Sequence, residues 1–227
     1  MMRDTDVYNS GDLVQRLRRV DVCSVSDALD RLGLSGVLDG VLPISGTGRV
    51  AGRAITVELG PVTEHRPSRH LCTAAVEAAG PDDVIVVAHQ ARRDCAGWGG
   101  NLSRAAKHRG VAGTIVHGWV RDTDESRDVG YPVFAMGSTP RTARGRAQEH
   151  TWGATVQLGD VRVAAGDYVI GDGSGVVVFG ASDAERVITT AAEICAIEAK
   201  MASAIERGQP VDDVMGRDYE NMTEGRA

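Results

Sequence analysis

Apolar and polar residues alternate along this chain in blocks that predict both helices and strands. Near the start, residues 12–17 and 24–32 carry apolar side chains at helical spacing, and Gly33 is expected to end the second of these helices. Another helix is predicted over 71–79. A long C-terminal helix, capped by Ser182, is expected to run to about residue 207.

Short apolar runs between turn residues predict the strands. The interval 49–59 is expected to be a strand with a break or bulge at Gly52, because glycine inside a strand often marks one. Further strands are predicted at 84–87, 111–116 and 131–135, and two hairpins at 156–163 and 167–179. Helices and strands alternate early and tight hairpins follow, so we expect an α/β fold.

The length of 227 residues predicts a single domain over 11–208, with a loose segment at 1–10 and a polar tail at 209–227. The chain lacks a P-loop, a GxGxxG turn after a first strand and a GxSxG elbow, which argues against a doubly wound nucleotide-binding fold. Hydrophobic residues make up 42% of the chain but aromatic residues only 4%, so the core must be built mainly from aliphatic side chains.

Charge and cysteine content remove several classes of function. The net charge is −6 and no long basic run is present, so we expect no nucleic-acid partner. The four cysteines are scattered without a CxxC pair, which argues against a zinc site and a disulfide framework. No apolar run reaches the roughly 18 residues of a membrane span, and the first residues are polar, so a cytoplasmic protein is expected.

The richest stretch for chemistry is 98–122, WGGNLSRAAKHRGVAGTIVHGWVRD. A glycine pair opens a helix there, a buried strand follows, and the pair Arg121-Asp122 comes after the strand. Free N–H groups at a helix start attract anions, and a carboxylate binds hard cations. Together these two element ends could hold a small anion and a divalent metal.

This stretch, with the YPVFAMGSTP that follows it, resembles a family that groups 4-hydroxy-4-methyl-2-oxoglutarate/4-carboxy-4-hydroxy-2-oxoadipate aldolases with the regulator of ribonuclease activity A. The segments VSDALDRLG, GRVAGRAITV, DDVIVV and GDYVIGDGSGVVV extend the resemblance over roughly residues 20–208. It implies a swivelling-type β/β/α layered domain with N-terminal helices and a long C-terminal helix. It also implies a homotrimer or homohexamer with the site at a subunit interface.

The resemblance implies a role for each matching residue. The substrate carboxylate would be held by the turn and by Arg121, and Asp122 would ligate Mg²⁺ or Mn²⁺. An acidic residue on the last helix of a neighbouring subunit would hold the metal's waters, with Glu198 the best match and Glu193 the second. The turn itself comprises Gly99, Gly100, Asn101 and Leu102.

Elementary chemistry agrees with these roles. A 2-oxo acid offers a carboxylate and a keto oxygen that can chelate one hard cation, which then acts as a Lewis acid. Arginine supplies a permanently charged planar fork for the carboxylate. We therefore expect a class II lyase that cleaves a 4-hydroxy-2-oxo acid to pyruvate and a carbonyl product, with oxaloacetate decarboxylation as a side or main reaction.

One departure from the family pattern keeps other hypotheses open. Many of the aldolases carry Asp or Glu where this chain has Gly100, and losing such a carboxylate costs roughly 10–100-fold in affinity or activity. The nearby His89 or Asp94 could replace it as an acid/base group, or the chain could act on a different 2-oxo acid. The main alternative is a non-catalytic regulator that binds a ribonuclease or another protein. A menaquinone methyltransferase is not supported, because no glycine-rich strand–turn–helix for a nucleotide is present.

Simpler interpretations accompany these candidates. The Arg121-Asp122 pair could be a surface ion pair, and Asn101 could only cap a helix. His117, Trp98 and Trp119 are expected to be packing residues. Cys95 has no visible histidine partner in the sequence, so a thiol nucleophile is not expected.

Overall fold

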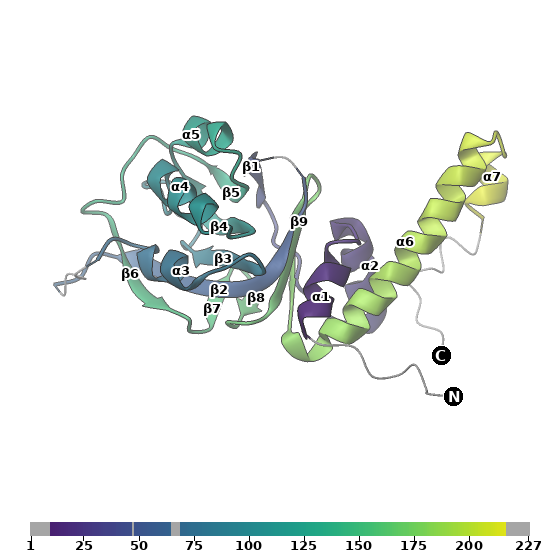
Figure 1. The fold of residues 1–227 in the computed structure, drawn as a ribbon, viewed down its shortest axis with the longest axis horizontal. Coiled ribbons are helices and arrows are strands. Elements are labelled where there is room, and N and C mark those ends of the chain that lie inside the picture. Colours follow the sequence, from purple (N-terminus) through teal and green to yellow (C-terminus); the bar gives the residue numbers. More distant parts are fainter. Residues whose placement is uncertain (1–9, 47, 65–68, 217–227) are drawn as a thin grey trace.

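The structure is a computed structural model that describes residues 10–46, 48–64 and 69–216. The predicted loose start therefore lies outside the described residues up to residue 9, and helix α1 (Ser10–Leu17) begins directly after it. Of the predicted polar tail, the described part contains a short helix, α7 (Val211–Val214). Figure 1 shows a sheet-centred body from which one long helix projects.

The body is organised around a curled sheet in the order β1-β5-β4-β3-β2-β9-β10, with β6 pairing with the far half of β2. The four central strands are parallel, and the strands at both edges are antiparallel to their neighbours. The strands are β1 (Leu42–Ser45), β2 (Val50–Pro61), β3 (Asp83–Ala88), β4 (Gly113–Val120), β5 (Val133–Ser138), β6 (Ala147–Trp152), β9 (Tyr168–Asp172) and β10 (Gly175–Phe179).

Three short helices connect the parallel strands: α3 (Thr73–Ala78), α4 (Gly100–His108) and α5 (Thr123–Asp128). Alternate residues of the central strands, such as Ile85 and Val87, pack toward this helical layer. The intervening residues, such as Val84 and Val86, pack against a small hairpin formed by β7 (Val156–Leu158) and β8 (Val161–Val163). The sheet is thus buried on both faces, which explains its continuous apolar runs.

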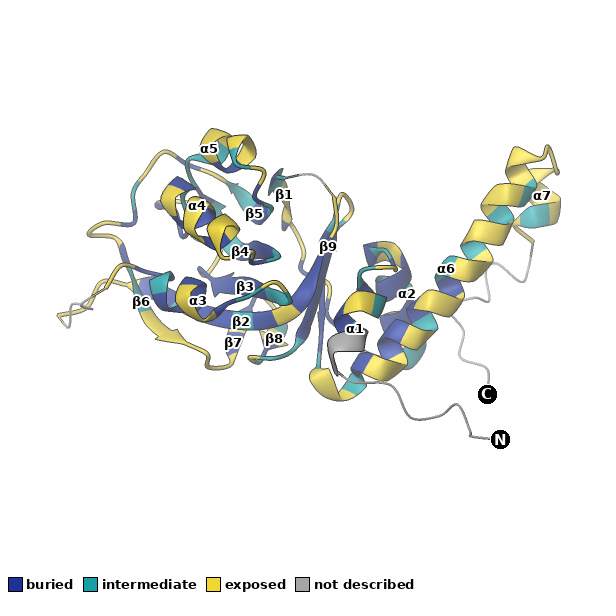
Figure 2. Ribbon diagram, in the orientation of Figure 1, coloured by how far each residue is buried: buried dark blue, intermediate teal, exposed yellow. Residues whose placement is uncertain are grey.

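A second apolar cluster fixes the helices at the other end of the molecule. There α1 and α2 (Val22–Leu32) pack with the first half of α6 (Ala184–Glu206) against β9 and β10. Buried residues in α6 end at Ile194, and the later half extends away from the sheet, as Figure 2 shows by its mostly exposed colouring. No helix within the described residues is both long and apolar enough to cross a membrane.

Several local predictions need correction. Strand β2 is continuous through Gly52, which pairs regularly with β9; its glycine is needed because a Cβ there would lie 2.6 Å from the carbonyl oxygen of Asp82. Ser182 does not cap α6, because it lies in a preceding 3₁₀ turn, Ala181–Asp183. Helix α2 starts earlier than predicted, capped by the carboxylate of Asp21. Strands β1 and β6 were not predicted.

Candidate active site

Two loops at the carboxyl ends of β3 and β4 form the candidate site. Backbone hydrogen bonds hold them side by side: Gly97 N donates to Trp119 O at 2.7 Å, and Arg121 N donates to Trp98 O at 3.0 Å. This is the edge where ligands bind in open parallel sheets. The pairing places the glycine turn directly beside the Arg-Asp pair, as the sequence predicted.

The carboxylate of Asp122 is held by hydrogen bonds from Gly100 and Arg121 at this junction. Its Oδ2 accepts hydrogen bonds from Gly100 N at 3.2 Å and from Arg121 Nε at 3.0 Å. Its backbone lies in the left-handed region at φ 56°, a conformation that costs free energy for a non-glycine residue and concentrates at functional sites. The side chain remains 30% exposed, so it does not point into a sealed apolar interior.

Both glycines of the turn lie close to acidic side chains. A Cβ at Gly99 would lie 2.9 Å from Asp122 Oδ2. A Cβ at Gly100 would lie 2.5 Å from Glu125 Oε2 and 2.8 Å from Glu125 Cδ. The carboxylate of Glu125 therefore lies over the position where a side chain of residue 100 would be.

A cleft of about 180 Å³ opens at this junction. Its inner end is lined by Gly99, Asn101, Leu102, Arg121 and Asp122. Within the described residues, the N–H groups of Asn101 and Leu102 have no backbone or side-chain acceptor, and Arg121 makes no hydrogen bond through its Nη atoms. Gly100 does not line the cleft, because it is buried beneath Glu125 and its N–H already binds Asp122.

A buried polar chain fixes the position of Asp122 from below. The indole N–H of Trp98 donates to Ser103 Oγ at 2.9 Å, and Ser103 Oγ lies 2.8 Å from Ser126 Oγ. Ser126 Oγ then donates to the carbonyl oxygen of Asp122 at 3.4 Å. Trp98 also stacks on Tyr131, with ring centroids 6.4 Å apart. Trp98 is thus a structural residue at the cleft wall, and Trp119 packs under Arg93 at 5.7 Å.

The alternative acid/base candidates do not reach the cleft. His89 is fully buried, its Nε2 lies 3.0 Å from Cys95 O, and burial lowers its pKa. Asp94 is exposed and forms a two-point pair with Arg92, at 2.9 and 2.6 Å, which lowers the pKa of its carboxyl to about 2. Neither residue lines the cleft beside Asp122.

Cys95 does have a histidine neighbour that the sequence could not reveal. Its Sγ lies 3.8 Å from His89 Nε2. The thiol is nevertheless fully buried, and burial raises its pKa, so it is not an activated nucleophile. His117 is half-buried, its Nδ1 has no hydrogen-bond partner within the described part of the chain, and burial lowers its pKa.

The carboxylate oxygens at this junction suit a hard divalent cation that takes only one or two protein ligands. Asp122 and Glu125 both flank Gly100 and line a neighbouring hollow, whereas of the two only Asp122 also lines the cleft. Mg²⁺ is commonly held by one or two carboxylates together with water. Over residues 10–46, 48–64 and 69–216 no cluster of three or more His, Cys, Asp or Glu side chains is placed to hold a metal. A metal here would thus need water, substrate or a neighbouring subunit to complete its coordination.

Comparison with known proteins identifies the family of this chain. Residues 22–178 match the RraA-like family, described as Aldolase/RraA. The chain belongs to this family. It is 36% identical over 164 residues to a Burkholderia multivorans protein provisionally named a 4-hydroxy-4-methyl-2-oxoglutarate aldolase, covering 71% of this chain and 95% of that one. It is also similar to Protein DlpA of Legionella pneumophila, at 27% identity over 88% of this chain, but it spans only a third of that relative's length.

The fold of this RraA-like protein is shared with solved members of the family. Streptomyces coelicolor RraAS2, described as an unusual member of the RNase ES inhibitor RraA protein family, superposes with a TM-score of 0.75 and 27% identity, over 89% of this chain and 99% of that one. The predicted α/β fold with a long C-terminal helix is thereby confirmed, as is the family. The known relatives thus include proteins named as aldolases and proteins named as ribonuclease inhibitors.

Sequence reasoning missed Glu125 and expected Glu198 from a neighbouring subunit. Glu125 lies on α5, three residues after Asp122, and the signal available was this spacing together with the missing side chain at residue 100. Glu198 lies on α6, where its Oε2 is 3.5 Å from Ser24 Oγ, and its burial, then the nearby charges of Asp21 and Asp27, raise its pKa. Glu193 pairs instead with Arg31 at 3.8 Å.

Proposed function

We propose that this RraA-like protein is a divalent-metal-dependent carbon–carbon lyase. It cleaves a 4-hydroxy-2-oxo acid to pyruvate and a carbonyl product, and it also decarboxylates oxaloacetate. The observation that carries the proposal is the convergence of Asp122, Arg121 and the start of α4 on one cleft, with Glu125 covering Gly100.

Arg121 and the helix start would bind the carboxylate of the substrate. The Nε of Arg121 is taken by Asp122, which leaves the planar pair of Nη atoms for a carboxylate. The N–H groups of Asn101 and Leu102, at the positive end of α4, supply two further donors beside it. The 2-oxo end of the substrate would therefore lie against Asp122.

Asp122 and Glu125 would hold Mg²⁺ or Mn²⁺. Such a cation, when bound, supplies the Lewis acidity that carbon–carbon cleavage next to a 2-oxo group requires. Glu125 provides the carboxylate that the missing side chain at residue 100 would otherwise provide. The departure from the family pattern at Gly100 is thereby compensated within the same subunit, and we infer a competent site.

Pyruvate release tests the proposal. The purified full-length protein is assayed with Mg²⁺ or Mn²⁺ on 4-hydroxy-4-methyl-2-oxoglutarate and on oxaloacetate, before and after treatment with EDTA. We expect release that stops with EDTA and returns with added metal. The proposal is wrong if no substrate is cleaved, or if Asp122→Ala cleaves as well as the unaltered protein.

The regulator hypothesis makes an opposite prediction for the same protein. The likeness to RraAS2 supports it, but the partly exposed Asp122 and the cleft donors that have no acceptor within the described residues play no role in it. A ribonuclease inhibitor without lyase activity would tolerate Asp122→Ala and Arg121→Ala with unchanged inhibition.

A further inference from the structure

The cleft beside Asp122 continues outward past a second cationic group. Its outer wall is formed by the loop after β5, which contributes Thr142, Ala143 and Arg144, and by His70 before α3. These residues also line a second hollow of about 340 Å³. The two hollows therefore share one wall, and we refer to them together as the channel; Arg121 lines the inner hollow and Arg144 lines both.

The loop that carries Arg144 is rigidly attached to the site. Arg146 N and Ala147 N both donate to the carbonyl oxygen of Ala143, at 2.8 and 2.9 Å, and Ala143 is buried. Ala96 N, directly before the glycine turn, donates to Arg141 O at 3.0 Å. Arg92 Nη1 donates to Arg146 O at 2.9 Å. The outer wall thus has a fixed position relative to Asp122.

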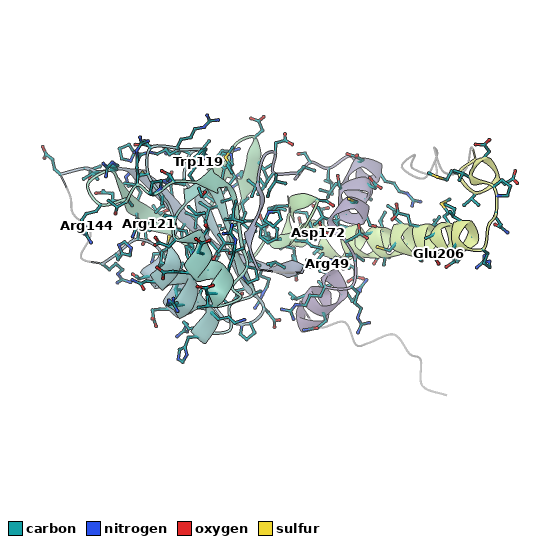
Figure 3. The ribbon with its side chains drawn as sticks, turned by 90° about the horizontal axis from the view of Figure 1, so that it is seen from above. Arg49, Trp119, Arg121, Arg144, Asp172 and Glu206 are labelled. Atoms are coloured by element: carbon teal, nitrogen blue, oxygen red, sulfur yellow. The ribbon has the colours of Figure 1, made fainter. Side chains whose placement is uncertain are left out.

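Among the described residues, Arg144 differs from Arg146 and Arg92 in having an unpaired charged group, and from Arg141 in lining the cleft. Arg146 uses its guanidinium on Thr142 O at 3.3 Å, and Arg92 uses its own on Asp94. Among the residues that the structure describes, the guanidinium of Arg144 has no hydrogen-bond or ion-pair partner, although it lines the channel. In Figure 3, Arg144 and Arg121 lie at the same end of the molecule, opposite Glu206 on α6.

The charged side chains that line the outer part of the channel are mostly cationic, so this part favours binding of an anion. Besides Asp122, the only acidic residue among the described residues that line either hollow is Glu149, and its Oε2 already accepts a hydrogen bond from Cys72 N at 2.6 Å. Arg69 and His70 add positive or protonatable groups. This cationic channel lies in a chain of net charge −6, so its sign is local to the site.

We propose that Arg144 is a specificity-determining residue that binds a second carboxylate at the far end of the substrate. The inference rests on the proposed lyase function and assigns a residue to the second carboxylate that 4-hydroxy-4-methyl-2-oxoglutarate and oxaloacetate, the substrates proposed above, both carry. The 2-oxo end lies at Arg121 and Asp122, and the distal carboxylate pairs with the guanidinium of Arg144. A planar guanidinium matches a carboxylate in two-point geometry.

A pair of substrates that differ in one group tests this role. 4-Hydroxy-2-oxoglutarate and 4-hydroxy-2-oxopentanoate are cleaved in the same way but end in a carboxylate and a methyl group. For Arg144→Gln we expect kcat/KM on the first to fall by roughly 10–100-fold, mainly through KM, because a charge-assisted hydrogen bond is lost. On the second it should be unchanged. Arg144→Lys should recover part of the loss.

Arg141→Gln is the matched control. Arg141 lies in the same loop with the same charge, but its side chain does not line either hollow, and only its backbone carbonyl contacts Ala96. Arg141→Gln should leave kcat/KM unchanged on both substrates. Equal losses on both substrates for Arg144→Gln, or no loss on either, would overturn the proposal.

Binding measurements separate this proposal from the lyase function itself. 2-Oxoglutarate and 2-oxopentanoate lack the 4-hydroxyl group and again differ only in the terminal group. With Mg²⁺ present, calorimetric titration should show tighter binding of 2-oxoglutarate, and Arg144→Gln should remove that preference. A preference that persists in Arg144→Gln refutes the subsite, whereas a preference that disappears supports it even if no substrate is cleaved and the lyase function fails.

Discussion

The carboxylate of Glu125 occupies the place that a side chain at Gly100 would take, with Oε2 2.5 Å from the position of the absent Cβ. The two residues belong to different helices, α4 and α5, which pack together beside the cleft. Glu125 also pairs with Arg104 at 3.4 Å, so it is held on the α4 surface. The carboxylate of Glu125 on α5 thus fills the space of the side chain that Gly100 on α4 lacks.

Exchanging these two positions is the first test. Glu125→Ala should lower apparent metal affinity or kcat by about 10–100-fold, the usual effect of losing a carboxylate that supports a metal site. Gly100→Asp alone should displace the half-exposed side chain of Glu125, because its Cβ would overlap that carboxylate. In the double variant the overlap is removed and a carboxylate returns, so activity should recover toward that of the unaltered protein. Activity is measured as a function of metal concentration for the three variants. A double variant with no more activity than Glu125→Ala would show that a carboxylate at residue 100 cannot replace Glu125.

Asp122→Asn should separate folding from activity. Asparagine tolerates the left-handed backbone at φ 56° and its amide oxygen can still accept the Gly100 N–H, so the free energy of unfolding should change by less than about 1 kcal/mol. Activity should fall by at least ~100-fold, because the anionic oxygen donor is lost. Denaturant unfolding and pyruvate release measure the two effects.

The control for that variant is Asp124→Asn. Asp124 lies two residues further along and its side chain is 91% exposed; among the described residues it pairs only with Arg127, at 2.6 Å. It should leave activity unchanged and stability within about 0.5 kcal/mol. A comparable loss of activity in Asp124→Asn would mean that general charge, not the position of Asp122, governs the reaction.

The glycine turn and the Arg-Asp pair could both be predicted from the sequence, but the position of Glu125 beside them could not. A glycine pair opening a helix and an Arg-Asp pair after a strand are local patterns, and parallel strand ends meet at one edge of a sheet. Glu125 was missed because it is one of several acidic residues in a polar segment, alongside Asp124 and Asp128. Only the packing of α5 on α4 distinguishes it from them.

The fold shows the same division between local and tertiary signals. Helix α2 and the long helix α6 follow from their apolar periodicity, and strand β3 from a continuous apolar run. Strand β6 was missed because most of its residues are polar and at least partly exposed, so it pairs with β2 without the alternation that identifies a half-buried strand. Tertiary pairing decides such edges.

Removing a hydroxyl from the polar chain beneath Asp122 should weaken both stability and activity. Ser126 is 2% exposed and links Ser103 Oγ to the carbonyl oxygen of Asp122. Ser126→Ala leaves a buried donor without a partner, so we expect a loss of about 1–3 kcal/mol in the free energy of unfolding. Ser103→Ala should cost a similar amount, and the double variant less than the sum, because both break one chain. Additive costs in denaturant unfolding would show that the two hydroxyls act separately.

Stability should fall in mild acid because of His89. Burial lowers the pKa of this histidine from 6.5, and the fold therefore favours the neutral ring. A lowered pKa in the folded state contributes stability that is fully present above about pH 6.5 and is lost as the pH falls through the folded value. His89→Gln can still donate to Cys95 O but does not titrate, so its free energy of unfolding should fall less between pH 7 and 5.

His117→Gln is the comparison for this variant. Burial lowers the pKa of His117 too, but its side chain is only partly buried. Its removal should therefore reduce the pH dependence of the free energy of unfolding less than His89→Gln does. Denaturant midpoints at a series of pH values give both profiles. Identical slopes for the unaltered protein and His89→Gln would show that other groups carry the acid sensitivity.

Glu198 allows a test of whether the site is completed by a second subunit. Helix α6 projects from the sheet at the opposite end of the molecule from α4 and α5 (Figure 1), and Glu198 on this helix lies near Ser24. If its carboxylate supports the metal site of a neighbour, Glu198→Gln should lower kcat/KM by roughly 10–100-fold. Glu193→Gln, on the same helix but paired with Arg31, should not. Glu198→Gln and Asp122→Asn, each defective alone, should then regain activity when co-expressed, because mixed oligomers contain some junctions with both groups intact. Mixed oligomers with no more activity than the average of the two parents would place Glu198 outside the site.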